Sequence, residues 1–157
     1  MNIRVNAVLQ AKDVGILAGL TENAVKQWTI GRPYKILPSV RHSTGKGMPN
    51  LYSLTDALRF AVARDLTGDG FQSRVIQRVL DSFDPSANTL LITGMRIEFS
   101  HQSPLRCATE AVRYRESHEF VYLSFYVLDM KAIREAQNES FERTIMYIQG
   151  AARRAKK

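Results

Sequence analysis

The alternation of apolar and polar positions between residues 11 and 29 predicts two short helices joined by a turn. The apolar or small residues that would meet between these helices are Val14, Ala18, Leu20, Val25 and Trp28. Gly19 lies at the break between the two helical patterns. Helices joined by such a turn cross steeply around a shared apolar centre. We therefore expect helices over about 11–18 and 22–29, with Trp28 packed between them.

The second of these helices carries side chains suited to contact with nucleic acid. Thr21 precedes it, where the threonine hydroxyl can accept a hydrogen bond from a free backbone N–H of the first turn. The residues that would then point outward are Glu22, Asn23, Lys26 and Gln27. Side chains of these types hydrogen-bond to base edges and phosphates in a DNA groove.

A basic hairpin follows the second helix. Residues 36–41 and 50–52 form its expected strands, and the loop between them contains two glycines, a proline and Lys46. Such a composition is typical of an exposed turn. Arg41, His42 and Lys46 are the residues that we expect to reach along a phosphate backbone. The loop lacks the glycine spacing of a nucleotide-binding P-loop.

Two longer helices are predicted after the hairpin. Ser53 and Asp56 have the spacing of a capping pair at the start of the first one, and its apolar positions continue to Leu66. A glycine-containing turn at 68–70 separates it from the second helix. The apolar positions of the second helix end at Phe83, before a proline.

The second half of the chain changes character. Residues 90–99 and 120–128 are rich in residues that favour β-strands, with a short helix expected around 108–115. A last helix is predicted over about 131–148. The residues that we expect this helix to bury are Ile133, Ala136, Phe141, Ile145 and Ile148.

These elements predict an α+β protein of two parts. Residues 1–84 would form a helix-turn-helix head with a hairpin wing. Residues 85–157 would form a small α+β domain, with a β-hairpin or small sheet, a C-terminal helix and a basic tail.

The net charge of +7 is unevenly distributed. Residues 1–83 contain 11 Lys and Arg against 6 Asp and Glu, whereas residues 84–157 contain 11 against 9. Four of those last 11 belong to the tail and are Arg153, Arg154, Lys156 and Lys157. A basic head on a nearly neutral second half is typical of a protein that binds a polyanion.

The sequence gives little support for a secreted, membrane-spanning or disulfide-bonded protein. The N-terminal residues lack the apolar stretch of a signal peptide, and no run of about 18 apolar residues occurs. The single cysteine, Cys107, excludes an internal disulfide, and we expect its side chain to be buried or half-buried. The chain is expected to be cytoplasmic.

No catalytic constellation stands out, since the carboxylates are scattered and no nucleophile is paired with a base. His42, His101 and His118 lack the spacing of metal ligands. We therefore expect no enzymatic activity, no cofactor and no metal site.

Three segments of the first half also follow one another in an informative order. They read Leu-Thr-Glu-Asn-Ala-Val-Lys-Gln-Trp at 20–28, Asn-Leu-Tyr-Ser-Leu-Thr-Asp at 50–56 and Gly-Asp-Gly-Phe at 68–71. Together, residues 11–83 resemble the DNA-binding domain of the MerR family of transcription regulators, which is a winged helix-turn-helix. The same domain also resembles the DNA-recognition end of phage small terminase subunits.

The MerR resemblance implies roles for individual residues. Lys26 takes the place of a recognition-helix arginine that contacts DNA, Arg41 lies in the wing, and Tyr52 matches an aromatic residue whose hydroxyl meets a phosphate. Gln27 and Trp28 replace the family's paired tyrosines. A β-rich region follows Phe83 in place of the family's long dimerising helix.

The expected function is sequence-specific binding of double-stranded DNA, most simply as a MerR-like transcription regulator. A recognition subunit for phage or plasmid DNA processing, of the small terminase or excisionase type, is the first alternative. A winged-helix interaction module that binds no DNA is the second. The expected DNA-contacting residues are Thr21, Asn23, Lys26, Gln27, Arg41, His42, Lys46 and Tyr52. Residues 86–150 are expected to mediate a homodimer or higher homo-oligomer.

Overall fold

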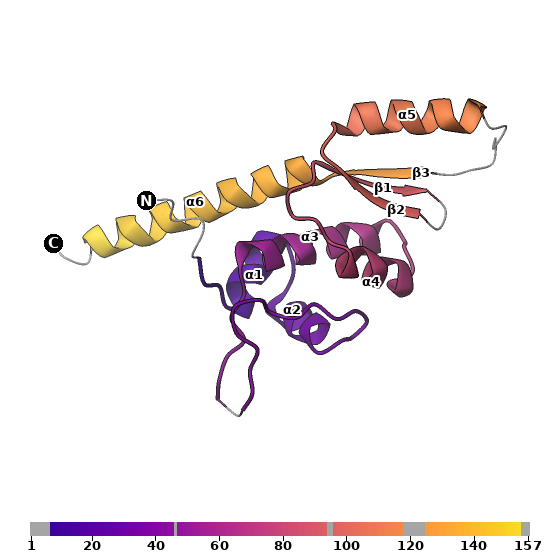
Figure 1. Ribbon diagram of the computed structural model, residues 1–157. Coiled ribbons are helices and arrows are strands. Elements are labelled where there is room, and N and C mark those ends of the chain that lie inside the picture. The colour runs from indigo at the N-terminus through magenta and orange to yellow at the C-terminus, as the bar shows by residue number, and fades with distance from the viewer. Residues whose placement is uncertain (1–6, 46, 94–95, 118–124, 155–157) are drawn as a thin grey trace.

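Helices and a small antiparallel sheet make up the protein in this computed structural model, which describes residues 7–45, 47–93, 96–117 and 125–154 (Figure 1). The elements of these residues are α1 (Ala11–Ala18), α2 (Glu22–Thr29), α3 (Leu54–Gly68), α4 (Ser73–Asp81), β1 (Thr89–Thr93), β2 (Arg96–Ser100), α5 (Pro104–Ser117), β3 (Phe125–Asp129) and α6 (Met130–Arg154). The mixed content confirms the α+β class. Within the described ranges, no helix is long and apolar enough to cross a bilayer.

The helix pair α1–α2 begins and ends where the sequence pattern predicts. Gly19 ends α1 in the left-handed region, at φ 66°. The Thr21 hydroxyl caps α2 by accepting a hydrogen bond from the Ala24 amide at 3.1 Å. A Cβ atom at Gly15 would lie 2.8 Å from the carbonyl oxygen of Leu20. Glycine at position 15 therefore permits the close turn between the two helices.

The hairpin, residues 36–52, has less strand structure than predicted. It is joined by one isolated bridge between Arg41 and Leu51, and a second bridge joins its end, Tyr52, to Leu9. The prediction of two regular strands was wrong in extent. Pro38 and Pro49 explain the difference, because proline has no N–H to donate to a strand ladder.

The carboxylate of Asp56 joins the hairpin to α3. Its Oδ2 accepts a hydrogen bond from the Ser53 amide at 2.9 Å, and the Ser53 hydroxyl accepts one from the Asp56 amide at 3.1 Å. This reciprocal pair confirms the predicted capping box. The same Oδ2 accepts hydrogen bonds from the backbone amide of Ser39 at 2.9 Å and from its hydroxyl at 2.6 Å.

The sheet has the strand order β2-β1-β3, with both pairs antiparallel. The region predicted as β-rich, 90–99, divides into the two strands of a β-hairpin. Leu91 in the central strand pairs with Glu98 on one side and Val127 on the other. Of the strand predicted over 120–128, the part up to residue 124 lies outside the described residues.

Helices α5 and α6 are both longer than predicted. The α5 helix begins at Pro104, because proline at a first helical position loses no intrahelical hydrogen bond, and it buries Cys107 as expected. The α6 helix follows β3 directly, and the Asp129 carboxylate accepts a hydrogen bond from the Ala132 amide at 2.9 Å. Figure 1 shows α5 lying over the sheet and α6 running past α1 and α3.

The prediction for the buried face of α6 was wrong in part. Ala136 is exposed, whereas Gln137 is buried and donates a hydrogen bond to the carbonyl oxygen of Ala57 in α3 at 2.8 Å. The half-buried apolar residues are Ile133 and Phe141. The side chains of Ile145 and Ile148 lie outside the described residues.

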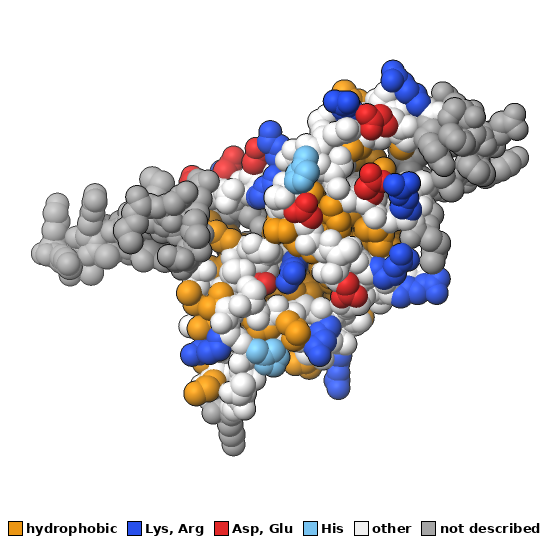
Figure 2. Space-filling view, viewed as in Figure 1, with side chains coloured by type: hydrophobic (Ala, Val, Ile, Leu, Met, Phe, Trp, Pro, Cys, Tyr) orange, Lys and Arg blue, Asp and Glu red, His pale blue; other side chains and the backbone are white. Residues whose placement is uncertain are grey.

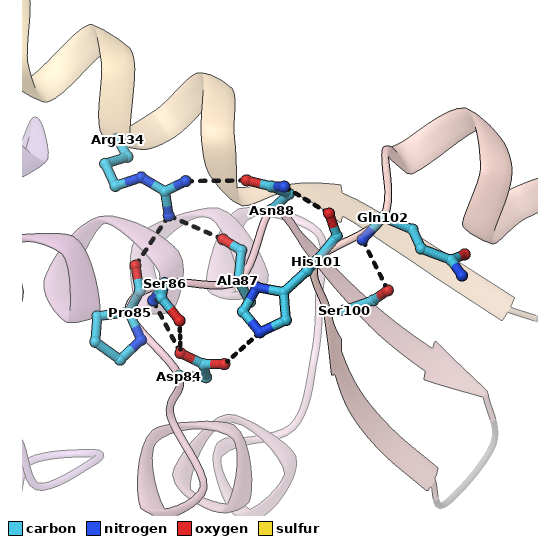
Figure 3. Close-up of polar contacts among 9 residues, drawn as sticks. All are labelled: Asp84, Pro85, Ser86, Ala87, Asn88, Ser100, His101, Gln102 and Arg134. Carbon is cyan, nitrogen blue, oxygen red and sulfur yellow. Dashed lines mark hydrogen bonds and ion pairs between the residues drawn. The ribbon is translucent and has the colours of Figure 1, made fainter.

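Arg134 of α6 forms hydrogen bonds to the segment between α4 and β1 (Figure 3). Its guanidinium donates hydrogen bonds to the carbonyl oxygens of Pro85 and Ala87, at 2.9 and 2.8 Å, and to the Asn88 side chain at 3.1 Å. Asn88 in turn donates to the carbonyl oxygen of His101 at 2.6 Å. This Arg134 junction joins α6, the 85–88 segment and the end of β2.

One hydrophobic core spans both parts of the chain. Its buried members run from Leu9 and Trp28 through α3 and α4 to Leu90, Ile92 and Met130. Ring contacts also cross from the first part to the sheet, where Phe83 meets Phe99 at 5.7 Å and Phe71 meets Tyr126 at 4.9 Å. Residues 1–84 and 85–157 therefore share a core in this structure.

Candidate nucleic-acid interface

The surface of α2 separates sharply into a buried side and an exposed side. Val25, Trp28 and Thr29 are buried, whereas Asn23 and Lys26 are exposed. The cause is the helical repeat, which places residues three or four apart on one face. Two further predicted DNA contacts also lie along this helix. Thr21 is exposed and Gln27 is half-buried.

Lys26 forms an ion pair with Glu22 one helical turn earlier, at 2.6 Å. The hydrogen bond and the positive charge of Lys26 lower the pKa of Glu22 below its ordinary value. Both side chains are well exposed, at 60% for Lys26 and 46% for Glu22. Exposed pairs of this kind are held weakly because water and salt screen them. The ammonium group of Lys26 is therefore able to exchange its carboxylate partner for a phosphate.

Trp28 belongs to the core, as predicted from its position in the pattern. Its ring stacks on Phe60 of α3 with a centroid distance of 6.0 Å and an interplanar angle of 6°. Tyr34 meets the same ring edge-on at 4.8 Å. These contacts fix α2 against α3 and orient its exposed side.

Tyr52 lies in the core, and this corrects the role that the MerR resemblance implies for it. The residue is 0% exposed, and its hydroxyl lies 2.8 Å from the hydroxyl of Thr29. Burial raises the pKa of Tyr52 above its ordinary value. In this conformation the hydroxyl is enclosed by protein, so it does not reach a phosphate.

Arg41 and His42 lie exposed at the base of the hairpin loop. The backbone of Arg41 is fixed by hydrogen bonds in both directions to Leu51, at 3.0 and 2.9 Å. Its guanidinium donates a hydrogen bond to the carbonyl oxygen of Pro49 at 3.3 Å. Because arginine has five N–H donors, others can bond to solvent or a ligand. Lys46, the third predicted contact of the loop, lies outside the described residues.

The structure brings α2 and the hairpin to the same side of the molecule, away from α5 and the sheet (Figure 1). Figure 2 shows Lys and Arg side chains along this side, with few Asp or Glu among them. Two elements separated in sequence by the 30–35 turn thus contribute to one polar surface that carries basic side chains. We name it the α2–hairpin surface and define it by Thr21, Asn23, Lys26, Gln27, Arg41 and His42.

Three more basic side chains lie on the elements around this surface, and sequence reasoning missed them. Lys12 of α1 is exposed and close enough to Glu22 to lower the pKa of that carboxyl further. Arg32 and Lys35 are exposed in the segment that follows α2. The signal that could have identified them was charge alone, because none of the three belongs to a motif.

The described residues contain no group of three His, Cys, Asp or Glu side chains placed to hold a metal ion. Comparison of the sequence with models of known protein families and with curated proteins gives no match.

Proposed function

We propose that this protein binds double-stranded DNA in a sequence-specific manner through a MerR-like winged helix-turn-helix. In this proposal α2 enters the major groove and the hairpin acts as the wing. The observation that carries it is the α2–hairpin surface, where two separate elements on the same side of the molecule carry exposed polar and basic side chains. A helix in the major groove flanked by backbone contacts is a common means of reading DNA.

In this proposal α2 contacts the bases and the hairpin contacts the phosphate backbone. Asn23, Lys26 and Gln27 have donors and acceptors that match base edges, whereas Arg41 and His42 carry donors suited to phosphate oxygens. A recognition helix of eight residues reads few base pairs. We therefore also propose a homodimer or higher homo-oligomer through residues 86–150, since two-fold symmetry doubles the number of contacts.

Regulation of transcription in the cytoplasm is the leading role for such a protein. Recognition of DNA for packaging or excision is a second role that the same surface would serve. Mass measurement by light scattering separates the two, because a dimer is typical of a regulator and a large ring is typical of a packaging subunit.

The proposal is tested by selection of duplexes from a random pool, followed by fluorescence anisotropy across a salt series. We expect a recovered consensus and an affinity that falls steeply with salt, because phosphate contacts release counterions. Recovery of no consensus, together with no binding at low salt, would contradict the proposal and favour a winged-helix protein-interaction module.

Lys26→Ala and Lys131→Ala form a matched pair for this test. Each lysine pairs with a glutamate four residues away on its helix, and the two side chains are 60% and 59% exposed. Lys26→Ala should reduce the preference for the selected duplex over random DNA, by roughly 1–3 kcal/mol for a good base contact. Lys131→Ala, on α6, should leave that preference unchanged.

A further inference from the structure

The hairpin has solvent-exposed apolar side chains close in sequence to its basic side chains. Leu37 is 46% exposed, Val40 is 45% exposed and Met48 is 56% exposed. Among the described residues only four other large apolar side chains are as open, and those are Val8, Ile16, Ile30 and Leu105. An exposed apolar cluster on a projecting element is typical of a contact surface.

Met48 lies at the projecting end of this hairpin. The bridge between Arg41 and Leu51 closes the base, and a hydrogen bond of 3.3 Å from the Met48 amide to the Gly45 carbonyl oxygen closes the tip. The three residue steps from residue 42 to residue 45 extend the loop by at most about 10 Å at the usual rise of a strand. Figure 1 shows this loop extending well clear of the helices.

That reach matches the geometry of a duplex whose major groove holds α2. The neighbouring groove along the DNA is the minor groove, which lies across one phosphate backbone and is about 6 Å wide and 7.5 Å deep. A loop whose base contacts the phosphates through Arg41 and His42 would place its tip at that groove. A thioether there meets sugars and base edges rather than phosphate oxygens.

We propose that the hairpin is an apolar wedge as well as a phosphate contact, and that Met48 inserts into the minor groove beside the site read by α2. This inference rests on the proposed DNA binding and adds a residue that determines specificity. Apolar side chains placed in this way unstack neighbouring base pairs. The favoured sequences are therefore those that unstack easily, pyrimidine–purine steps such as TA and CA.

Val40 is nearer to the base of the hairpin, two residues beyond Pro38 and next to Arg41. Its place predicts contact with the sugars of the strand that Arg41 grips. The apolar and the ionic contacts of the hairpin would then act on the same stretch of backbone, but they differ in one measurable respect. Contact between apolar groups releases no counterions, whereas the arginine contact does.

The test uses the full-length protein and a duplex recovered by the selection described above. Affinity is measured by anisotropy across a salt series for wild type, Met48→Ala, Arg41→Ala and Val8→Ala. Val8 is the matched control, since it is 56% exposed like Met48 but lies outside the hairpin. We expect Met48→Ala to weaken binding about five- to tenfold with an unchanged slope against log salt. Arg41→Ala should make the slope shallower by about one.

A second measurement reports the unstacking itself. The fluorescent base 2-aminopurine, placed at the step expected to open, should brighten when wild type or Val8→Ala binds and stay dim with Met48→Ala. If wild type binds, and Met48→Ala binds with the same affinity and gives the same fluorescence, the insertion of Met48 is overturned while the proposed function stands. Absence of wild-type binding in low salt would overturn both.

Discussion

The hydroxyl groups of Thr29 and Tyr52 lie 2.8 Å apart in the core and join the end of α2 to the returning arm of the hairpin. The Thr29 hydroxyl donates its hydrogen to the carbonyl oxygen of Val25 at 2.8 Å. Tyr52 is therefore the donor in the bond between the two hydroxyls. This buried bond fixes the helix and the hairpin of the α2–hairpin surface relative to each other.

The direction of that bond predicts unequal effects for its two partners. Tyr52→Phe removes the donor but leaves Thr29 bonded to Val25, so we expect a loss of about 0.5–1.5 kcal/mol in the free energy of unfolding. Thr29→Val leaves the tyrosine hydroxyl buried without its acceptor, and the loss should reach about 1–3 kcal/mol. Urea denaturation followed by circular dichroism measures both.

The same variant checks the corrected role of Tyr52. If this residue acts only in the core, Tyr52→Phe should leave the affinity for the selected duplex unchanged under conditions in which the variant is folded. A several-fold loss of affinity would instead assign its hydroxyl to a phosphate.

Stability should fall at high pH because of Tyr126. Burial, followed by a hydrogen bond to Asp69 at 2.5 Å and the negative charge of that carboxylate, raises the pKa of Tyr126 above its ordinary value. The folded state thus retains a proton that the unfolded chain loses near pH 10. This stabilisation is complete below that pH and is lost as the pH rises above it.

The measurement compares urea unfolding at neutral pH with unfolding above pH 10. Wild type should lose stability more steeply than Tyr126→Phe, which has no proton to lose at this position. Tyr52, whose pKa is also raised by burial, remains in both proteins and contributes the same slope to each. Equal slopes for the two proteins would contradict the assignment to Tyr126.

The hydrogen bonds of the Arg134 junction should contribute measurably to the free energy of unfolding (Figure 3). Arg134→Ala removes three hydrogen bonds and should lower the free energy of unfolding by about 1–3 kcal/mol. Arg134→Lys should recover only part of it, because Nη1 reaches both carbonyl oxygens while Nη2 reaches Asn88, and a single ammonium nitrogen cannot occupy both positions. Arg143→Ala is the control on the same helix, where the side chain is 82% exposed in an ion pair with Glu139.

Two glycines should respond in opposite directions to alanine. Gly15→Ala brings a Cβ atom to 2.8 Å from the Leu20 carbonyl oxygen, so the turn between α1 and α2 must shift at a cost of about 1–3 kcal/mol. Gly68→Ala, at the end of α3, meets nothing within 4 Å and should raise stability by about 0.5–1 kcal/mol. Thermal denaturation of the two variants and wild type measures the difference.

Local patterns in the sequence predicted the first half of the fold closely. The ends of α1 and α2 follow from Gly19 and Thr21, whose effects act within one helical turn, and the capping box of α3 follows from Ser53 and Asp56. The length of the hairpin strands was overestimated. The apolar residues of this segment favour a strand, but Pro38 and Pro49 lack the amide hydrogens that a strand ladder needs.

The second half was harder to predict because its contacts are distant in sequence. The burial of Gln137 depends on the carbonyl oxygen of Ala57, 80 residues earlier, and no periodicity in α6 contains that information. The position of Tyr52 has the same origin. The resemblance supplied a surface role, whereas the burial of its hydroxyl against Thr29 depends on how the hairpin packs.

The shared core limits how far this protein can be treated as interchangeable modules. Gln137 of α6 donates a hydrogen bond to α3. Phe71 and Phe83 pack against aromatic rings of the sheet strands. A chimera that joined residues 1–84 to a foreign partner domain would leave these surfaces uncovered. Engineering the head for a new target would therefore be easier by changing residues on α2 within the complete chain than by transplanting the head.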